Sequence, residues 1–157
     1  MSTALRGPIA TLAGRLAAAS ALPSSLPKTI LRVALGGVLV FAGTSHLTVG
    51  RTEFLAQVPP WVPLDADLVV VLSGIAEIAI GLALLALPRR RAAAGLVAAT
   101  FFVLIFPGNV SQYLDGIDAF GLSSDGARLA RLSFQPLLVA WALWATDAWR
   151  VFVRGRA

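Results

Sequence analysis

Glu77 and His46 are the two residues of this sequence whose types and positions could support proton transfer. Glu77 lies near the middle of an apolar run, Leu68 to Leu87, that is long enough to cross a bilayer. A carboxylate at that depth is costly unless it is protonated, paired or facing water, so its default interpretation is functional. His46 is the only histidine and stands at the end of another apolar run. We therefore expect Glu77 and His46 to be the catalytic residues.

Four more polar side chains are expected to bind a substrate beside them, namely Ser73, Asn109, Gln112 and Gln135. Helical spacing places Ser73, Gly74 and Gly81 on the face of Glu77, and small residues on a membrane helix let a second helix approach closely. In the preceding apolar run, Gly36 and Gly43 likewise share a face. These two small-residue faces predict a packed seam that turns Glu77 inward.

Each of these residues also has a structural interpretation. Glu77 could be a protonated carboxyl group bonded to Ser73 or to a neighbouring helix, and His46 could cap a helix end. Asn109 follows a Pro-Gly pair and Gln135 precedes a proline, so both could satisfy backbone groups that the prolines leave free. The sequence keeps these alternatives open.

The elements that must position these residues are membrane-spanning helices. The chain of 157 residues is 57% apolar and 13% charged, and its mean hydropathy is +0.81. A soluble domain carries about twice that charged fraction. Four segments reach spanning length, which is about 17 to 25 residues: 29–47, 68–87, 92–110 and 132–153. We predict an all-α, integral membrane four-helix bundle over residues 29–153.

Charge predicts the orientation of this bundle. Ten of the 13 Lys and Arg residues lie in the N-terminal arm, at the start of the first span, in the turn after the second span, or near the C-terminus. By the positive-inside rule both termini face the cytoplasm of a bacterial inner membrane. Residues 1–28 are expected to form a short cytoplasmic arm, weakly amphipathic and lying on the membrane surface, and residues 154–157 a basic tail. Asp147 and Arg150 are expected to form a local ion pair.

An ordered set of short motifs resembles a known family. These motifs are Phe41-Ala42-Gly43-Thr44-Ser45-His46-Leu47, Val58-Pro59-Pro60-Trp61-Val62-Pro63, Ser73-Gly74-Ile75-Ala76-Glu77, Phe106-Pro107-Gly108-Asn109 and Arg131-Leu132-Ser133-Phe134-Gln135-Pro136. In this order and spacing they are similar to the DoxX-like group of small four-helix bacterial membrane proteins, which includes DoxX and MauE proteins. The likeness covers about residues 31–146, and it matches the family positions His46, Glu77, Asn109 and Gln135.

The resemblance implies an accessory membrane subunit of an oxidoreductase system, because some relatives are linked to sulfur-compound oxidation and quinone reduction. An outward-facing polar cavity would hold a quinone or another small substrate. With one His and no Cys, the chain is expected to hold no metal or covalently bound cofactor, and a redox partner protein would supply electrons. The other expected partners are the lipid bilayer and a second copy of the chain. Nucleic acid is not expected, because the basic residues cluster at the ends of apolar segments.

Two other functions stay open at this point. The chain could bind or transport a small apolar or amphipathic molecule without chemistry, since four helices around a polar-lipped cavity suit that role equally well. It could also be a structural or assembly factor whose polar residues only lock helix packing.

Overall fold

All regular structure in the described part of the chain is helical. The computed structural model describes residues 8–153, so residues 1–7 of the expected arm and the expected basic tail lie outside the described residues. Its four long helices are α2 (Leu26–Leu47), α4 (Ala66–Ala86), α5 (Arg91–Leu114) and α6 (Asp125–Ala145). The short ones are α1 (Pro8–Ala21), α3 (Arg51–Leu55), the 3₁₀ helix η1 (Pro88–Arg90) and α7 (Arg150–Val153). Three segments are long and apolar enough to cross a membrane: α2, α4 and the continuous stretch Pro88–Leu114.

The helices begin where the sequence offers a cap or a proline. Asp65 precedes α4, and its side chain accepts a hydrogen bond from the amide of Leu68 at 3.0 Å. Ser124 does the same for α6 through the amide of Ala127, at 3.3 Å. Pro27 stands in the first turn of α2, where its missing N–H costs nothing. Local sequence signals therefore define these three starts.

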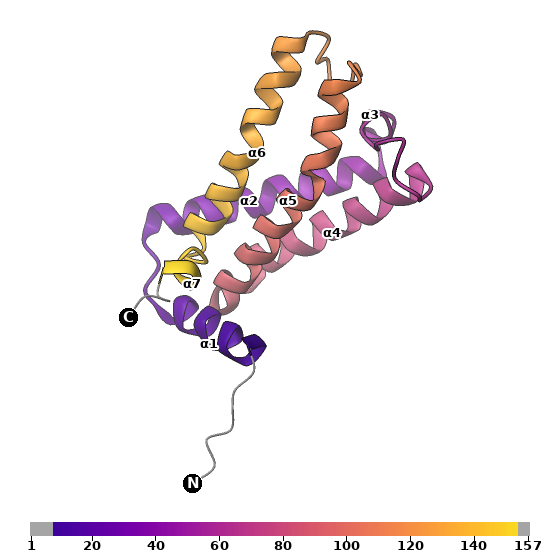
Figure 1. The fold of residues 1–157 in the computed structure, drawn as a ribbon. Coiled ribbons are helices and arrows are strands. Elements are labelled where there is room, and N and C mark those ends of the chain that lie inside the picture. The colour runs from indigo at the N-terminus through magenta and orange to yellow at the C-terminus, as the bar shows by residue number, and fades with distance from the viewer. Residues whose placement is uncertain (1–7, 154–157) are drawn as a thin grey trace.

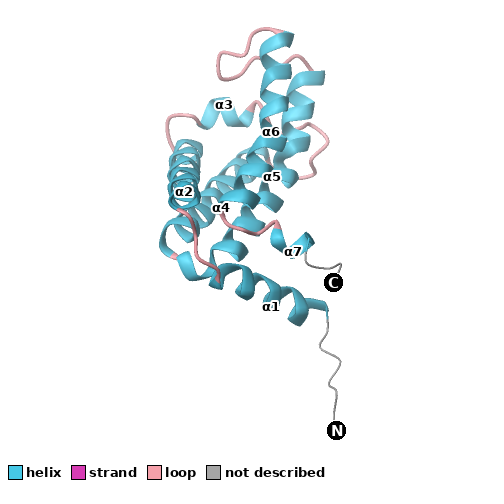
Figure 2. Ribbon diagram, turned by 90° about the vertical axis from the view of Figure 1, so that its left-hand side faces the viewer, coloured by secondary structure: helices cyan, strands magenta, loops and turns pink. Residues whose placement is uncertain are grey.

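The long helices form two antiparallel pairs, α2 with α4 and α5 with α6 (Figure 1). The pairs meet near α1 and α7 and diverge toward the opposite end, where α3 lies between α2 and the α5–α6 pair (Figure 2). The buried apolar core lies where the pairs meet and takes side chains from all four long helices, including Leu35, Leu84, Ala98, Phe102 and Ala142. The polar residues in the helix halves near α3 therefore lie between the two diverging pairs.

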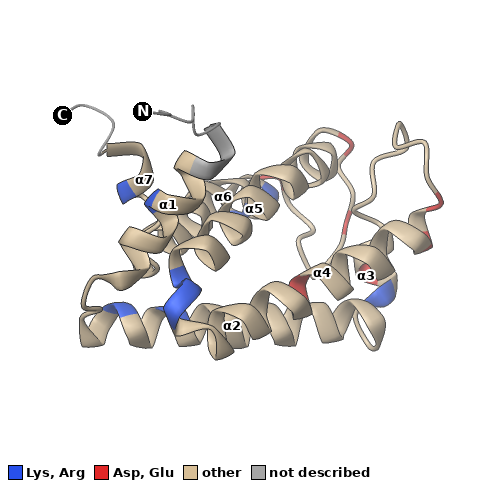
Figure 3. Cartoon of the chain, turned by 90° about the horizontal axis from the view of Figure 1, so that it is seen from below, with Lys and Arg blue, Asp and Glu red and all other residues tan. Residues whose placement is uncertain are grey.

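A buried ion cluster holds the two pairs together at the α1–α7 end. Asp147 is 1% exposed and contacts Lys28 at 2.6 Å, Arg150 at 3.0 Å and Arg91 at 3.2 Å. Burial raises the pKa of Asp147, but hydrogen bonds from Lys28, Arg150 and Arg91 outweigh it, so the pKa lies below its ordinary value. The predicted pair of Asp147 with Arg150 is confirmed as one contact of this larger cluster. Basic residues are visibly concentrated around this end of the molecule (Figure 3).

The expected span 132–153 is wrong in its boundaries. Helix α6 begins seven residues earlier, at Asp125, and ends at Ala145, before the separate helix α7. The break occurs because Asp147 adopts a positive φ of 63° and turns its carboxylate into the ion cluster. The first turns of α6 carry Arg128 and Arg131, and α6 is absent from the helices that could span a membrane by composition.

Two other boundaries also differ from expectation. Helix α5 continues through Pro107 to Leu114 instead of ending near residue 110. Residues 8–21 of the expected surface arm form helix α1, whose end is docked on the protein: Ala19 is buried against Ala92 and Ala148. Arg91 donates hydrogen bonds to the carbonyl oxygens of Ala19, Ser20 and Leu22, which fixes the end of α1.

Candidate functional site

A seam of glycines places His46 beside Glu77. A Cβ atom on Gly43 would lie 2.5 Å from the carbonyl oxygen of Gly74, and one on Gly74 would lie 2.7 Å from the Cβ of His46. Further along, a Cβ on Gly36 would lie 3.0 Å from the carbonyl oxygen of Gly81. Only glycine allows this close approach of two helix backbones. The small-residue faces predicted on the two runs therefore do pack against each other.

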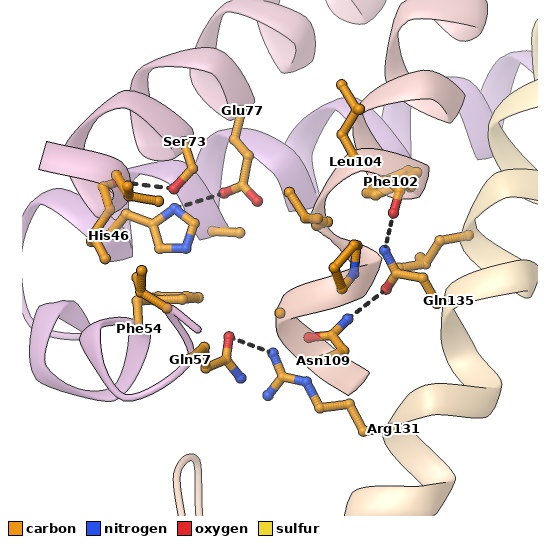
Figure 4. Close-up of a pocket in the computed structure, with 18 of the residues that line it drawn as sticks. His46, Phe54, Gln57, Ser73, Glu77, Phe102, Leu104, Asn109, Arg131 and Gln135 are labelled. Atoms are coloured by element: carbon orange, nitrogen blue, oxygen red, sulfur yellow. Dashed lines mark hydrogen bonds and ion pairs between the residues drawn. The ribbon is translucent and has the colours of Figure 1, made fainter. Parts of the chain in front are cut away.

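The His46 imidazole and the Glu77 carboxylate form a buried pair at the end of this seam. The Nδ1 atom of His46 lies 3.1 Å from the Oε2 atom of Glu77, and both side chains are less than a tenth exposed (Figure 4). The angle at this contact falls short of a hydrogen bond, and among residues 8–153 neither atom has another hydrogen-bond partner. Two buried polar atoms without good partners are costly. Such a pair is suited to give up or accept a proton when a ligand provides the missing partner.

The opposite wall carries a chain of amides between two proline-containing helices. Asn109 donates from Nδ2 to Oε1 of Gln135 at 3.0 Å, and Gln135 donates from Nε2 to the carbonyl oxygen of Phe102 at 2.5 Å. Phe102 lies in the turn of α5 before Pro107, and Gln135 lies in α6 just before Pro136. These two hydrogen bonds join α5 to α6. Gln135 thus does bond a backbone carbonyl, but one of α5 that neither proline frees.

Arg131 and Gln57 complete the polar rim near α3. The guanidinium group of Arg131 donates to Oε1 of Gln57 at 3.0 Å and lies over the ring of Phe120, 4.8 Å from its centroid. Among residues 8–153 no ion pair of Arg131 with a carboxylate is formed within 4.0 Å. Gln57 donates in turn to Oε1 of Gln112 at 2.9 Å. Arg131 is therefore a cation whose charge no acid in this part of the chain neutralises directly.

The cavity between these walls has a volume of about 430 Å³. Such a volume lies in the range of pockets for small organic ligands, about 300 to 1,000 Å³. His46 and Glu77 stand on one side, and Asn109, Gln135 and Arg131 on the other (Figure 4). Most of the remaining lining is apolar and includes Leu39, Trp61, Val70, Ile105 and Phe134. The cavity can therefore hold a mainly apolar molecule with polar atoms at two opposite ends.

Five of the six residues singled out in the sequence line this cavity: His46, Ser73, Glu77, Asn109 and Gln135. The hydroxyl group of Ser73 donates back to the carbonyl oxygen of Val70 at 2.9 Å. Gln112 does not line the cavity. It is 1% exposed and lies behind Gln57, because the continuation of α5 past Pro107 carries it toward the loop at Ile117, whose carbonyl oxygen it contacts.

Sequence reasoning missed four lining residues. Phe54 contacts the His46 ring edge to face, and Gln57, Trp61 and Arg131 line the cavity. The first three belong to helix α3 and the segment after it, where no spanning pattern draws attention to a single side chain. Arg131 was quoted only as part of a family motif, although it precedes Gln135 by four residues and therefore shares its helix face, which is a usable signal.

Helix α3 is held in place over the cavity by polar contacts on both sides. Arg51 forms a two-pronged ion pair with Asp67 at the start of α4. Glu53 accepts a hydrogen bond from the amide of Phe120 at 2.5 Å, and the ring of Phe120 contacts the ring of Phe54. A Cβ on Gly108 would lie 3.1 Å from the carbonyl oxygen of Gln57, so the segment after α3 rests directly on α5. The cavity is thus covered at the α3 end.

Comparison with known proteins yields one family. The chain belongs to the family described as a domain of unknown function (DUF8561), whose model matches residues 35–146. The match includes the whole of both cavity walls, from Leu35 to Leu138. No curated protein and no solved structure is similar enough to match the chain.

Proposed function

We propose that this member of the DUF8561 family is the membrane subunit of an oxidoreductase system and binds the head group of a quinone in the cavity. The observation that carries the proposal is the buried pair of His46 and Glu77, open to a cavity that has further hydrogen-bond donors on its far wall. The DoxX-like resemblance of the motifs around these residues supports the same function. In this proposal α6 crosses the bilayer beside α5, which makes a four-helix bundle with both termini in the cytoplasm of a bacterial cell.

The residues of the cavity fit a quinone head group. A quinone ring is flat and apolar and carries one carbonyl oxygen at each end, and the cavity is apolar in the middle and polar at both ends. His46 or protonated Glu77 provides a donor for one carbonyl oxygen. Arg131 provides donors for the other, and its unneutralised charge favours an oxygen that gains negative charge.

The chemistry assigned to the chain is proton transfer. Reduction of a quinone to a quinol takes up two electrons, which a partner dehydrogenase subunit supplies, and two protons. In the proposal Glu77 and His46 deliver one proton to the oxygen that faces them, and the second proton comes from the solvent once the quinol leaves the cavity. Phe54 packs on the imidazole ring of His46 and keeps it directed toward Glu77. Asn109 and Gln135 fix the distance between α5 and α6, and hence the position of the far wall.

A second function is favoured by Arg131 alone. A cation at a mainly apolar cavity, without a carboxylate partner in the described part of the chain, also suits the head group of an amphipathic anion such as a fatty acid. In that case the protein binds or transports its ligand without chemistry. The charge of the preferred ligand separates the two functions.

The test measures binding and turnover separately. The protein in lipid nanodiscs is titrated with a decyl-substituted benzoquinone, and quenching of Trp61 is read against a Trp61→Phe control. Native membranes then report quinol formation. We expect saturable quenching in the wild type, and in Glu77→Gln an unchanged fold, continued binding and loss of quinol formation. Asp125→Asn is the matched control, since it likewise replaces a carboxylate by its amide, at an exposed acid that does not line the cavity. Quinol formation that survives Glu77→Gln rejects the proton-transfer role, and saturable binding of a fatty acid without any of the quinone favours the second function.

A further inference from the structure

We infer that the ligand enters the cavity sideways from the bilayer, through a gap between α2 and α6, and that it carries an apolar tail that lies in this gap. The inference rests on the proposed function, because it adds the tail to the molecule whose head group the cavity binds. It assigns the ligand to the lipid-soluble quinones rather than to quinones or other small molecules that arrive from water.

The gap is bounded at both ends by hydrogen bonds. Toward the α1–α7 end, the indole Nε1 of Trp141 on α6 donates to the carbonyl oxygen of Leu31 on α2 at 3.0 Å. Toward the α3 end, Arg131 on α6 bonds Gln57, which follows α3, at 3.0 Å. Within the described part of the chain, the Trp141 contact is the one hydrogen bond that joins α2 directly to α6. Between these two levels, no hydrogen bond in this part of the chain joins α2 to α6.

The wall of the cavity is thin in this gap. Val38 on α2 and Phe134 on α6 both line the cavity, yet Val38 is 50% and Phe134 61% exposed. A side chain that lines a cavity and is also half exposed marks a place where the cavity meets the surroundings. Leu104 on α5 lines the cavity at 71% exposure as well, but the lining residues of the neighbouring helix α4 are buried or only partly exposed. Between α2 and α6 both helices carry an exposed lining side chain, so we place the opening there.

The level of this opening determines what surrounds it. Val38 lies 12 residues from the start of α2, which at 1.5 Å per residue is about 18 Å along a helix of about 33 Å. If α2 crosses the bilayer, that position is in the hydrocarbon core, which is about 30 Å thick. Only acyl chains or an apolar ligand can fill an opening there. The route from the α3 end is covered by Phe54, Gln57 and Phe120, so a lipid-soluble ligand has the more open path.

Two polar ends and one lateral opening also orient the ligand. Glu77 and His46 lie deeper in the cavity than Val38 when viewed from the gap, since both belong to the buried α2–α4 seam. A ligand that enters head first therefore brings its polar atoms to Glu77 and Arg131 and leaves its tail beside Val38 and Phe134. The tail then replaces lipid against these two side chains and needs no polar partner.

Photochemical labelling maps the tail directly. A benzoquinone with a diazirine midway along a decyl tail is bound to the protein in phosphatidylcholine nanodiscs, irradiated and digested with trypsin. We expect labelling that excess decyl benzoquinone competes away to fall in the peptides 33–51 and 132–150, which contain Val38 and Phe134. Competed labelling in the peptides 52–89 and 92–128 instead, which include Leu104 at 71% exposure on the α4–α5 side, overturns the assignment to this gap.

A pair of tryptophan variants provides the matched test. Val38→Trp places a large side chain in the gap, whereas Val33→Trp alters an equally apolar, 44% exposed position of α2 that does not line the cavity. We expect Val38→Trp to weaken competed labelling by tenfold or more, which corresponds to about 1.4 kcal/mol of binding, and Val33→Trp to leave it unchanged. Equal labelling in both variants rejects the lateral path. Saturable Trp61 quenching with labelling elsewhere keeps the proposed function while rejecting the gap, and absence of saturable quenching rejects both.

Discussion

Replacing Gly43 with alanine tests whether the close approach of α2 and α4 is what holds His46 against Glu77. The new Cβ would lie 2.5 Å from the carbonyl oxygen of Gly74, which is 0.9 Å short of the 3.4 Å where ordinary contact begins. It would also lie 3.0 Å from the Cβ of Glu77 itself. The carbonyl is backbone and cannot rotate away, so α2 and α4 must separate by several tenths of an ångström or more. Overpacking of this kind costs about 1–3 kcal/mol.

The expected result of Gly43→Ala is a lower unfolding temperature in detergent and a weaker contact between His46 and Glu77. The NMR resonances of the single imidazole should shift because His46 moves relative to the carboxylate of Glu77. Gly37→Ala is the matched control: Gly37 lies on the same helix, and a Cβ there meets nothing within 4 Å. Alanine in that helix interior stabilises by about 0.5–1 kcal/mol. If Gly43→Ala and Gly37→Ala change the unfolding temperature and the imidazole resonances alike, the seam does not position the pair.

Three further predictions concern polar contacts outside the seam. Asp147→Asn leaves Lys28 and Arg91 buried without their counter-charge. It should lower the free energy of unfolding, measured by heat or denaturant, by on the order of 3–5 kcal/mol. A change below about 1 kcal/mol would mean that the cluster is open to water. Because the pKa of Asp147 is lowered on folding, the contribution of Asp147 to the free energy of unfolding is present above its ordinary pKa near 3.8 and is lost as the pH falls below about 4. Acid should therefore destabilise the wild type more than Asp147→Asn. Gln135→Leu leaves the side-chain amide of Asn109 without its partner and should cost about 1–3 kcal/mol, whereas Leu137→Ala, at an exposed position of the same helix, should cost less.

The sequence predicted the seam well because its signal is periodic. Gly36 and Gly43 recur at the spacing of one helix face, as do Gly74 and Gly81 around Glu77, and small residues on two neighbouring membrane helices have one common use. A carboxylate between small residues can then only point toward the partner helix. The contact of Glu77 with His46 lies on this seam, and the structure adds it to what the pattern predicted.

The sequence failed where a single tertiary contact decides the outcome. The apolar run through Trp141 and Trp144 extends toward Val153, and its hydropathy alone predicts one continuous helix. The chain instead turns at Asp147, because two cations from distant helices, Lys28 and Arg91, stabilise its buried carboxylate together with the nearby Arg150. Gln112 was misplaced for a similar reason, since Pro107 lies inside α5 without ending it, and the local pattern around a proline does not show whether neighbouring groups satisfy the freed carbonyl.

The cavity exists because the helices pack closely within each pair, whereas the two pairs pack less closely against each other. Within a pair the backbones touch through glycine, as at Gly43 with Gly74, or through a small partner, as at Gly95, where a Cβ would overlap Thr146. Between the pairs the contact is tight only near the Asp147 cluster, and bulky side chains such as Phe134 keep the other halves apart. Changes within a pair should therefore move His46 relative to Glu77, whereas changes between the pairs should alter which molecules reach them.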